Sequence, residues 1–97
     1  MTEAVTSEPC RLDVWLWRAR FFKTRSLASR FIEEGRVRLH RDGAEARIDK
    51  PSRAVRVGDG LVFALGGRVV AISVADPGSR RGPAVEARTL YVALDEA

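Results

Sequence analysis

The apolar residues of this chain change their spacing at Gly35, and this change limits the fold more than any other feature. Before Gly35 they recur at the three- and four-residue intervals of an α-helix, first over 12–22 and again just ahead of the glycine. Residues 23–26 separate the two stretches, and the hydroxyl of Thr24 or Ser26 can cap the second helix. Gly35 can adopt the left-handed conformation that ends such a helix. The sequence therefore predicts two short helices joined by a tight turn.

Beyond the second predicted helix the apolar period is two. Val37 and Leu39 alternate with basic residues, as on a half-buried strand. Further along, Gly66-Gly67 joins two apolar runs at 61–65 and 68–74, and two successive glycines favour a tight hairpin turn. Weaker strand patterns occur at 46–49 and 89–94. Helices followed by strands predict an α+β fold with two helices packed on a small antiparallel β-sheet.

A chain of 97 residues holds one domain at most. Residues 1–10 are polar and lack periodicity, so we expect a disordered N-terminal tail. Residues 11–75 contain both predicted helices and the predicted hairpin, and we expect them to form the binding domain. Residues 76–97 begin with a Pro- and Gly-containing loop and are expected to complete the domain with a last strand. Trp15 and Leu16 lie on the apolar helical face and are predicted core residues.

Positive charge is concentrated in about one third of the chain. The segment 11–41 has nine basic and three acidic residues, a net charge of +6, whereas the residues from 42 onward are neutral overall. Residues 1–10 contribute two negative charges. A cluster of this kind is typical of a surface that binds a polyanion such as a nucleic acid.

Several classes of function are disfavoured by what the sequence lacks. The single Cys10 excludes an intramolecular disulfide and a cysteine-based zinc site, and the single His40 is flanked by arginines, as on a surface strand. The sequence has no phosphate-binding loop followed by lysine and serine or threonine. Its apolar runs are too short for a membrane span, and its start lacks the pattern of a secretory signal. We therefore expect a cytoplasmic protein that is not an enzyme, with no cofactor, metal, membrane partner or small-molecule substrate.

The segment Lys23-Thr24-Arg25-Ser26 combines two cations and two hydroxyls with a predicted helix start. Free backbone N–H groups and the helix dipole favour anions there, and arginine can bind a phosphate through two parallel hydrogen bonds. Arg30 projects from the flank of the same predicted helix, and Arg36 and Arg38 share one face of the following strand. Arg11, Arg18 and Arg20 add further charge from the first helix. The alternative is an ordinary solvated surface, on which Arg30 pairs with a neighbouring glutamate at helical spacing.

These residues resemble a known family. The positions that match are Arg11-Leu12-Asp13, Leu16, Thr24-Arg25-Ser26, Ala28, Ile32, Gly35, Val37, Leu39, Lys50-Pro51-Ser52 and Val57-Gly58-Asp59. Their pattern resembles the S4 RNA-binding domain, also called the alpha-L motif. The two tryptophans and the Phe-Phe-Lys-Thr-Arg-Ser run within 11–28 resemble one branch of it, the ribosome-associated heat-shock protein 15 family.

The resemblance implies a function as well as a fold. Members of this branch bind ribosomal RNA on large subunits that still hold peptidyl-tRNA after aborted translation. It implies ribosomal RNA, the large subunit and possibly a tRNA as partners, and we expect a monomer. The implied RNA-binding residues are Arg11, Lys23, Thr24, Arg25, Ser26, Arg30, Arg36 and Arg38, which largely coincide with those selected by charge. The loop at 40–50 is longer than in the family pattern, so its contacts cannot be transferred.

Three alternatives remain open from the sequence. S4-type domains also occur in RNA-modifying enzymes, so the chain could be the targeting module of a separate catalytic partner. Two helices joined by a tight turn also occur in DNA-binding helix-turn-helix proteins. A third alternative is a protein–protein adaptor that uses Trp17 and the C-terminal hairpin. For Trp17 the sequence allows either packing in the core or stacking on a base.

Overall fold

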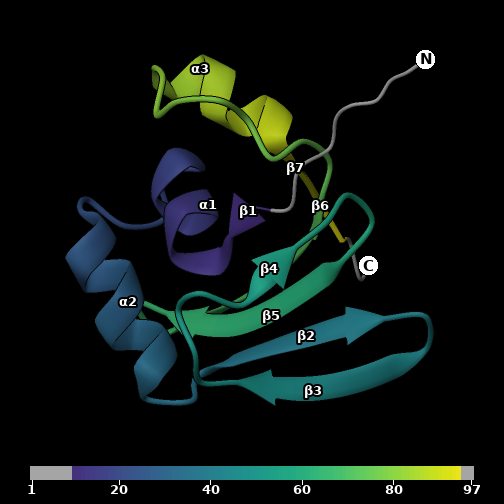
Figure 1. Ribbon diagram of the computed structural model, residues 1–97. Helices are drawn as coiled ribbons and strands as arrows, with labels where there is room; N and C mark the ends of the chain where they lie inside the picture. Colours follow the sequence, from purple (N-terminus) through teal and green to yellow (C-terminus); the bar gives the residue numbers. More distant parts are fainter. Residues whose placement is uncertain (1–9, 95–97) are drawn as a thin grey trace.

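The computed structural model describes residues 10–94, which form helices and two antiparallel sheets (Figure 1). In chain order the elements are β1 (Cys10–Arg11), α1 (Leu12–Arg18), α2 (Arg25–Glu33), β2 (Val37–Arg41), β3 (Ala44–Ile48), β4 (Ala54–Val55), β5 (Gly60–Leu65), β6 (Arg68–Val74), α3 (Ala84–Ala87), the 3-10 helix η2 (Arg88–Leu90) and β7 (Tyr91–Ala93). The predicted α+β class, with helices packed on an antiparallel sheet, is confirmed.

The larger sheet has the strand order β3-β2-β5-β6-β7, and every neighbouring pair is antiparallel. Val37 lies opposite Phe63 and Leu39 opposite Leu61, and all four side chains are buried in the core beneath the helices. The intervening Arg38 is exposed on the other face. The predicted alternation of apolar and basic residues along β2 therefore separates the core side of the sheet from a charged side.

The second helix begins and ends as its sequence indicates. Thr24 is the N-cap, and its hydroxyl accepts a hydrogen bond of 3.1 Å from the backbone N–H of Leu27. The helix ends at Glu33, and Gly35 follows with φ of +73°, a conformation that glycine adopts without steric cost. Phe31 and Ile32 are buried against α1 and the sheet. This capping fixes where α2 starts relative to α1.

The first helix is shorter than predicted. It ends at Arg18, and Arg20 adopts φ of +67°, which turns the chain out of the helix. Phe21 then packs against the rings of Phe63 and Tyr91, with centroids 5.5 and 5.0 Å apart. The expectation that Phe22 continues the helical face is therefore wrong, because α1 ends at Arg18 and the Phe22 ring instead packs on Phe31 of α2, with centroids 5.0 Å apart. The predicted core positions of Trp15 and Leu16 are confirmed, since both are fully buried.

The start of the described chain is ordered by a short sheet. Cys10, which the sequence placed at the end of the predicted tail, instead lies in β1 opposite Val55 of β4 and is buried. Its burial raises the pKa of the thiol. Residues 1–9, the rest of the predicted tail, lie outside the described residues.

The segment after β6 folds back over α1. The indole N–H of Trp15 donates to the carbonyl oxygen of Asp76 at 2.9 Å, and the guanidinium of Arg18 donates to the carbonyl oxygen of Gly78 at 2.8 Å. A short helix, α3, follows this loop and was not predicted. The last strand, β7, pairs with the end of β6, where Val74 lies opposite Tyr91. None of the helices within residues 10–94 is long and apolar enough to cross a membrane.

Candidate nucleic-acid interface

Two of the predicted arginines meet at one buried carboxylate. Arg11 donates from Nε and Nη2 to the two oxygens of Asp13, both at 3.0 Å, and Ser29 of α2 donates to Oδ2 at 2.9 Å. Arg25 Nη2 lies 3.8 Å from the same Oδ2. We name these four residues the Asp13 cluster. The cluster joins the start of α1 to the first turns of α2 and brings two cations together.

The environment keeps Asp13 ionised. Its carboxyl group is almost completely buried, and burial alone would raise its pKa. Hydrogen bonds from Arg11, Ser29 and the backbone N–H of Val14 outweigh burial and lower the pKa below the usual carboxyl value. The hydrogen bond to Asp13 in turn raises the pKa of Arg11. The side chains of Arg11 and Arg25 remain 51% and 50% exposed, so both guanidinium groups also face solvent.

The other predicted residues of the helix start are exposed around the Asp13 cluster. Lys23, Thr24 and Ser26 occupy the turn before α2 and its first residues. Arg30 lies one turn after Ser26 and is also exposed. Neither Lys23 nor Arg30 forms an ion pair with any of residues 10–94. The alternative that Arg30 pairs with a neighbouring glutamate is therefore not supported by the structure.

Arg36 and Arg38 contact different elements. Arg36 lies over the ring of Phe31, with its guanidinium carbon 4.4 Å from the ring centroid, and donates to Glu34 at 3.2 Å. Arg38 points away from the core and donates to Glu45 of β3 at 3.1 Å. Both glutamate pairs are exposed, and exposed pairs typically contribute only about 0–1 kcal/mol, so a bound phosphate can displace these carboxylates.

Three further basic residues extend this surface and were missed by the sequence analysis. Arg47 lies opposite Arg38 in the β2–β3 pairing, and its side chain covers Gly35 at the end of α2. Arg47, Lys50 and Arg53 line one small hollow. These residues lie in the part of the chain that is neutral overall, and only the strand pairing places a residue of β3 beside Arg38.

The segment that contains Lys50 and Arg53 also contacts the Asp13 cluster. The backbone N–H of Leu12 donates to the carbonyl oxygen of Arg53 at 2.8 Å, and that of Asp13 to Pro51 at 3.2 Å. Neighbouring contacts thus link the basic residues of β2 and β3 to the segment beside the starts of α1 and α2. We call this set of residues the basic face; its members are Arg11, Arg25, Arg38, Arg47, Lys50 and Arg53.

Not every arginine of the basic segment belongs to this surface. Arg18 and Arg20 donate to backbone carbonyl oxygens of the loop at 77–82, so they hold the C-terminal segment against α1. Arg41 donates to both oxygens of Asp59 at 2.8 and 2.7 Å. The expectation that the first helix adds all its arginines to the binding surface is wrong for Arg18 and Arg20, because main-chain acceptors occupy their guanidinium groups.

Comparison with known proteins identifies the family. Residues 10–39 match the S4 domain. A solved trimeric structure of heat shock protein 15 from Vibrio cholerae is 40% identical, with a TM-score of 0.76 over 90% of this chain and 83% of that chain. The chain belongs to the heat shock protein 15 family. Heat shock protein 15 from Escherichia coli K12 is 42% identical over 81 residues, and the homolog from Haemophilus influenzae is 41% identical over 81 residues.

The chain spans 57% of the length of the Escherichia coli heat shock protein 15 and 58% of the Haemophilus homolog. Within this family member, the S4 match contains the whole Asp13 cluster and ends at Leu39. Arg47, Lys50 and Arg53 lie beyond it. The basic face therefore combines residues of the S4 match with residues of the strand and loop that follow it.

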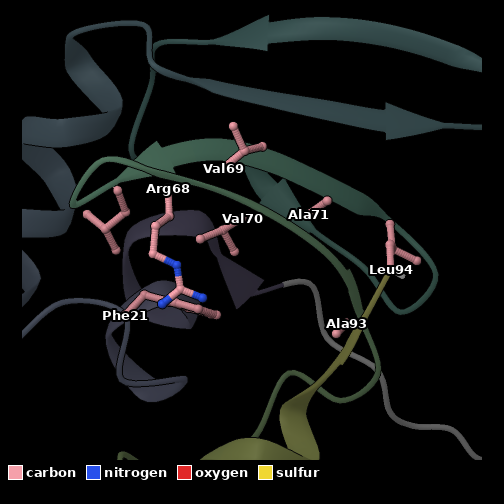
Figure 2. Close-up of a pocket in the computed structure, with 8 residues that line it drawn as sticks. Phe21, Arg68, Val69, Val70, Ala71, Ala93 and Leu94 are labelled. Atoms are coloured by element: carbon pink, nitrogen blue, oxygen red, sulfur yellow. The ribbon is translucent and has the colours of Figure 1, made fainter. Parts of the chain in front are cut away.

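A second surface feature is apolar and lies towards the other edge of the sheet. Figure 2 shows the side chains that line this groove beside β6, with Arg68 drawn close to Phe21. Its lining residues are Phe21, Leu65, Arg68, Val69, Val70, Ala71, Ala93 and Leu94. With a single cation among apolar side chains, this groove does not suit a polyanion. Residues 10–94 also contain no group of three metal-ligating side chains that could hold an ion.

Proposed function

We propose that this chain is a non-enzymatic RNA-binding protein that holds structured RNA on its basic face. The observation that carries the proposal is the pair of half-exposed guanidinium groups of Arg11 and Arg25, held side by side at the start of α2. Arginine binds phosphate bidentately, and the start of a helix favours anions. Membership of the heat shock protein 15 family and the S4 match support the same function.

The chemistry of the basic face favours recognition of RNA shape over sequence. Its members are arginines and a lysine, which suit phosphate oxygens and 2′-hydroxyl groups. Side chains cannot read the deep, narrow major groove of A-form RNA, so backbone contacts dominate the binding of folded RNA. Lys23, Thr24, Ser26 and Arg30 extend these contacts along α2, and Arg36 extends them at its end.

We further propose ribosomal RNA of the large subunit as the target, with peptidyl-tRNA close to the bound protein. This assignment follows from what the family resemblance implies and makes the chain part of ribosome rescue during stress. The monomeric state that we expect for this chain differs from the trimer of the Vibrio cholerae relative. Light scattering of the full chain at micromolar concentration would measure its mass in solution and decide between the two.

A charge-reversal experiment tests the proposed surface. We expect Arg25→Glu with Arg30→Glu to abolish cosedimentation with large ribosomal subunits while the circular dichroism spectrum stays unchanged. The matched control is Arg68→Glu with Arg88→Glu, which changes net charge equally on β6 and η2, towards the edge of the sheet opposite β3. The control should still cosediment. Equal binding by both double variants would contradict the site assignment.

The salt dependence and a competitor test the kind of ligand. Each phosphate neutralised by the protein releases a counterion, so affinity for ribosomal RNA fragments should fall steeply from low to moderate salt. A flat response would contradict a phosphate-binding surface. Duplex DNA of equal length should compete poorly with ribosomal RNA, and preferential binding of the duplex would favour a DNA-binding role instead.

A further inference from the structure

Asp13 is the one buried carboxylate to which both exposed arginines of the helix starts are linked. Oδ1 accepts from Arg11 Nε at 3.0 Å and from the backbone N–H of Val14 at 2.8 Å. Oδ2 accepts from Arg11 Nη2 at 3.0 Å and Ser29 Oγ at 2.9 Å, and Arg25 Nη2 lies 3.8 Å away. The Asp13 side chain is only 2% exposed, so it cannot itself touch a bound RNA.

The arrangement restricts two long side chains without using all their donors. An arginine has five N–H donors in a rigid plane. Arg11 uses only two of them, one on Nε and one on Nη2, in hydrogen bonds to Asp13. The side chains of Arg11 and Arg25 are 51% and 50% exposed, so part of each guanidinium remains accessible to a ligand. A free arginine loses rotamer freedom when it binds a ligand, whereas one already held in place loses less and binds more tightly.

We propose that Asp13 is a positioning residue for RNA: it raises affinity by holding Arg11 and Arg25 in one fixed arrangement at the junction of α1 and α2. This inference rests on the proposed function and names a determinant that makes no contact with the ligand. Ser29 takes part because its hydroxyl orients the carboxylate from α2. Arg25, at the greater distance, is positioned by charge attraction and Arg11 by a bidentate pair.

Simple electrostatics makes the opposite prediction, which gives the inference a sharp test. A carboxylate beside a phosphate-binding surface repels the ligand, so its removal alone should strengthen RNA binding. Loss of positioning should weaken binding. The sign of the change in affinity on neutralising Asp13 therefore separates the two effects.

The experiment compares the full-length wild type with Asp13→Asn for binding to a ribosomal RNA fragment at one fixed salt concentration. We expect affinity to fall about tenfold, the scale of one charge-assisted hydrogen bond. In the background of Arg11→Ala with Arg25→Ala, the same Asp13→Asn change should have almost no further effect, because there is nothing left to position. Thermal melts establish that each variant is folded at the temperature of the measurement.

Ser29→Ala provides a second variant that keeps every charge and suits a helix. We expect it to weaken RNA binding to a smaller degree, and it decides the outcome if Asp13→Asn does not fold. Unchanged or tighter binding by the folded variants, beside normal wild-type binding, would overturn the positioning role and leave the proposed function intact. Failure of the wild type to bind RNA would overturn both.

Discussion

Two buried aspartates of this protein share one pattern of arginine and backbone partners, and Asp13 has the Ser29 hydroxyl as an additional one. Asp13 and Asp59 are 1% and 3% exposed, and each accepts two hydrogen bonds from one arginine and one from a backbone N–H. The arginine of the first pair, Arg11, has a side chain that is 51% exposed, whereas Arg41 in the second is 29% exposed. The Arg11–Asp13 pair therefore presents an arginine to solvent, whereas the Arg41–Asp59 pair mainly stabilises the fold.

The second pair joins chain segments and offers little to a ligand. Arg41 lies at the end of β2, and Asp59 lies in the turn before β5 and accepts from the N–H of Arg56 at 2.8 Å. Arg41 Nη2 also points to the carbonyl oxygen of Ala54 at 3.4 Å. Its donors are thus directed to protein acceptors. The comparison shows that an arginine contributes to the basic face only where its guanidinium group remains exposed, whatever the number of arginines in the segment.

The largest effect is expected from Asp59→Ala, which leaves Arg41 without its carboxylate. Removing one partner of a buried ion pair costs about 3–5 kcal/mol, and we expect the lower end because Arg41 keeps partial access to water. Urea denaturation measures this free energy of unfolding. RNA affinity, measured well below the melting temperature, should equal that of the wild type. If the folded variant also bound RNA more weakly, the Arg41–Asp59 pair would contribute to RNA binding as well as to the fold, contrary to our interpretation.

Arg11→Ala should weaken RNA binding, the property that Asp59→Ala leaves unchanged, and it should also destabilise the fold because the buried Asp13 loses its bidentate partner. We expect RNA binding to weaken about tenfold, because one bidentate phosphate contact is lost. Filter binding or fluorescence anisotropy with a ribosomal RNA fragment measures the change. Arg88→Ala, which removes an exposed arginine of η2, is the matched control and should bind normally. If both variants bind equally well, Arg11 does not contact the RNA.

The pH dependence of stability compares the two carboxylates directly. The folded state lowers the pKa of Asp13 and of Asp59 from the ordinary value of 3.8. Burial opposes both shifts, and arginine hydrogen bonds outweigh it. The unfolded chain therefore binds protons first as pH falls, so the stabilisation is complete above 3.8 and is lost as pH drops towards the folded values. Urea unfolding at a series of acidic pH values should become less pH-dependent in Asp13→Asn and in Asp59→Asn. An unchanged slope would show that the carboxylate in question is not stabilised in the fold.

The smallest effect is expected at the exposed pair of Arg38 and Glu45. Glu45→Ala should change the free energy of unfolding by less than about 1 kcal/mol, since both side chains remain in solvent. RNA binding should become slightly tighter, because the carboxylate no longer competes with phosphate for Arg38. Weaker binding by Glu45→Ala would mean that this pair, like the Asp13 cluster, positions its arginine. The measurement therefore also tests whether positioning is confined to the buried carboxylate.

Local patterns predicted most of the elements but not all their limits. The change of period at Gly35, the hydroxyl before α2 and the glycine pair after Leu65 each specify a conformation through short-range sterics and hydrogen bonds. Gly66 and Gly67 do adopt positive φ values of +61° and +80°. The end of α1 was misplaced because Phe21 leaves the helix to pack against β5 and β7, and a helical period cannot reveal a contact with strands that lie about forty or more residues away.

Some residues of the candidate site could likewise be predicted from the sequence, and others could not. The cations around Thr24 are visible in the sequence because a basic segment coincides with a helix start. Arg47 and Arg53 were missed, since their proximity to Arg38 and α1 depends on strand register and on backbone contacts across the fold. The assignment of Arg18 and Arg20 to the binding surface was wrong for the same reason, because their acceptors lie in the distant loop at 77–82.

The amino-acid order by itself determined that this protein has two capped helices, an antiparallel sheet and a surplus of cations ahead of residue 42. These properties depend on neighbours within a few positions. Only the tertiary structure decided which guanidinium groups face solvent and which donate to Asp59 or to main-chain oxygens. The physical reason is that an arginine side chain is long and takes its partner from whatever acceptor the fold brings within reach.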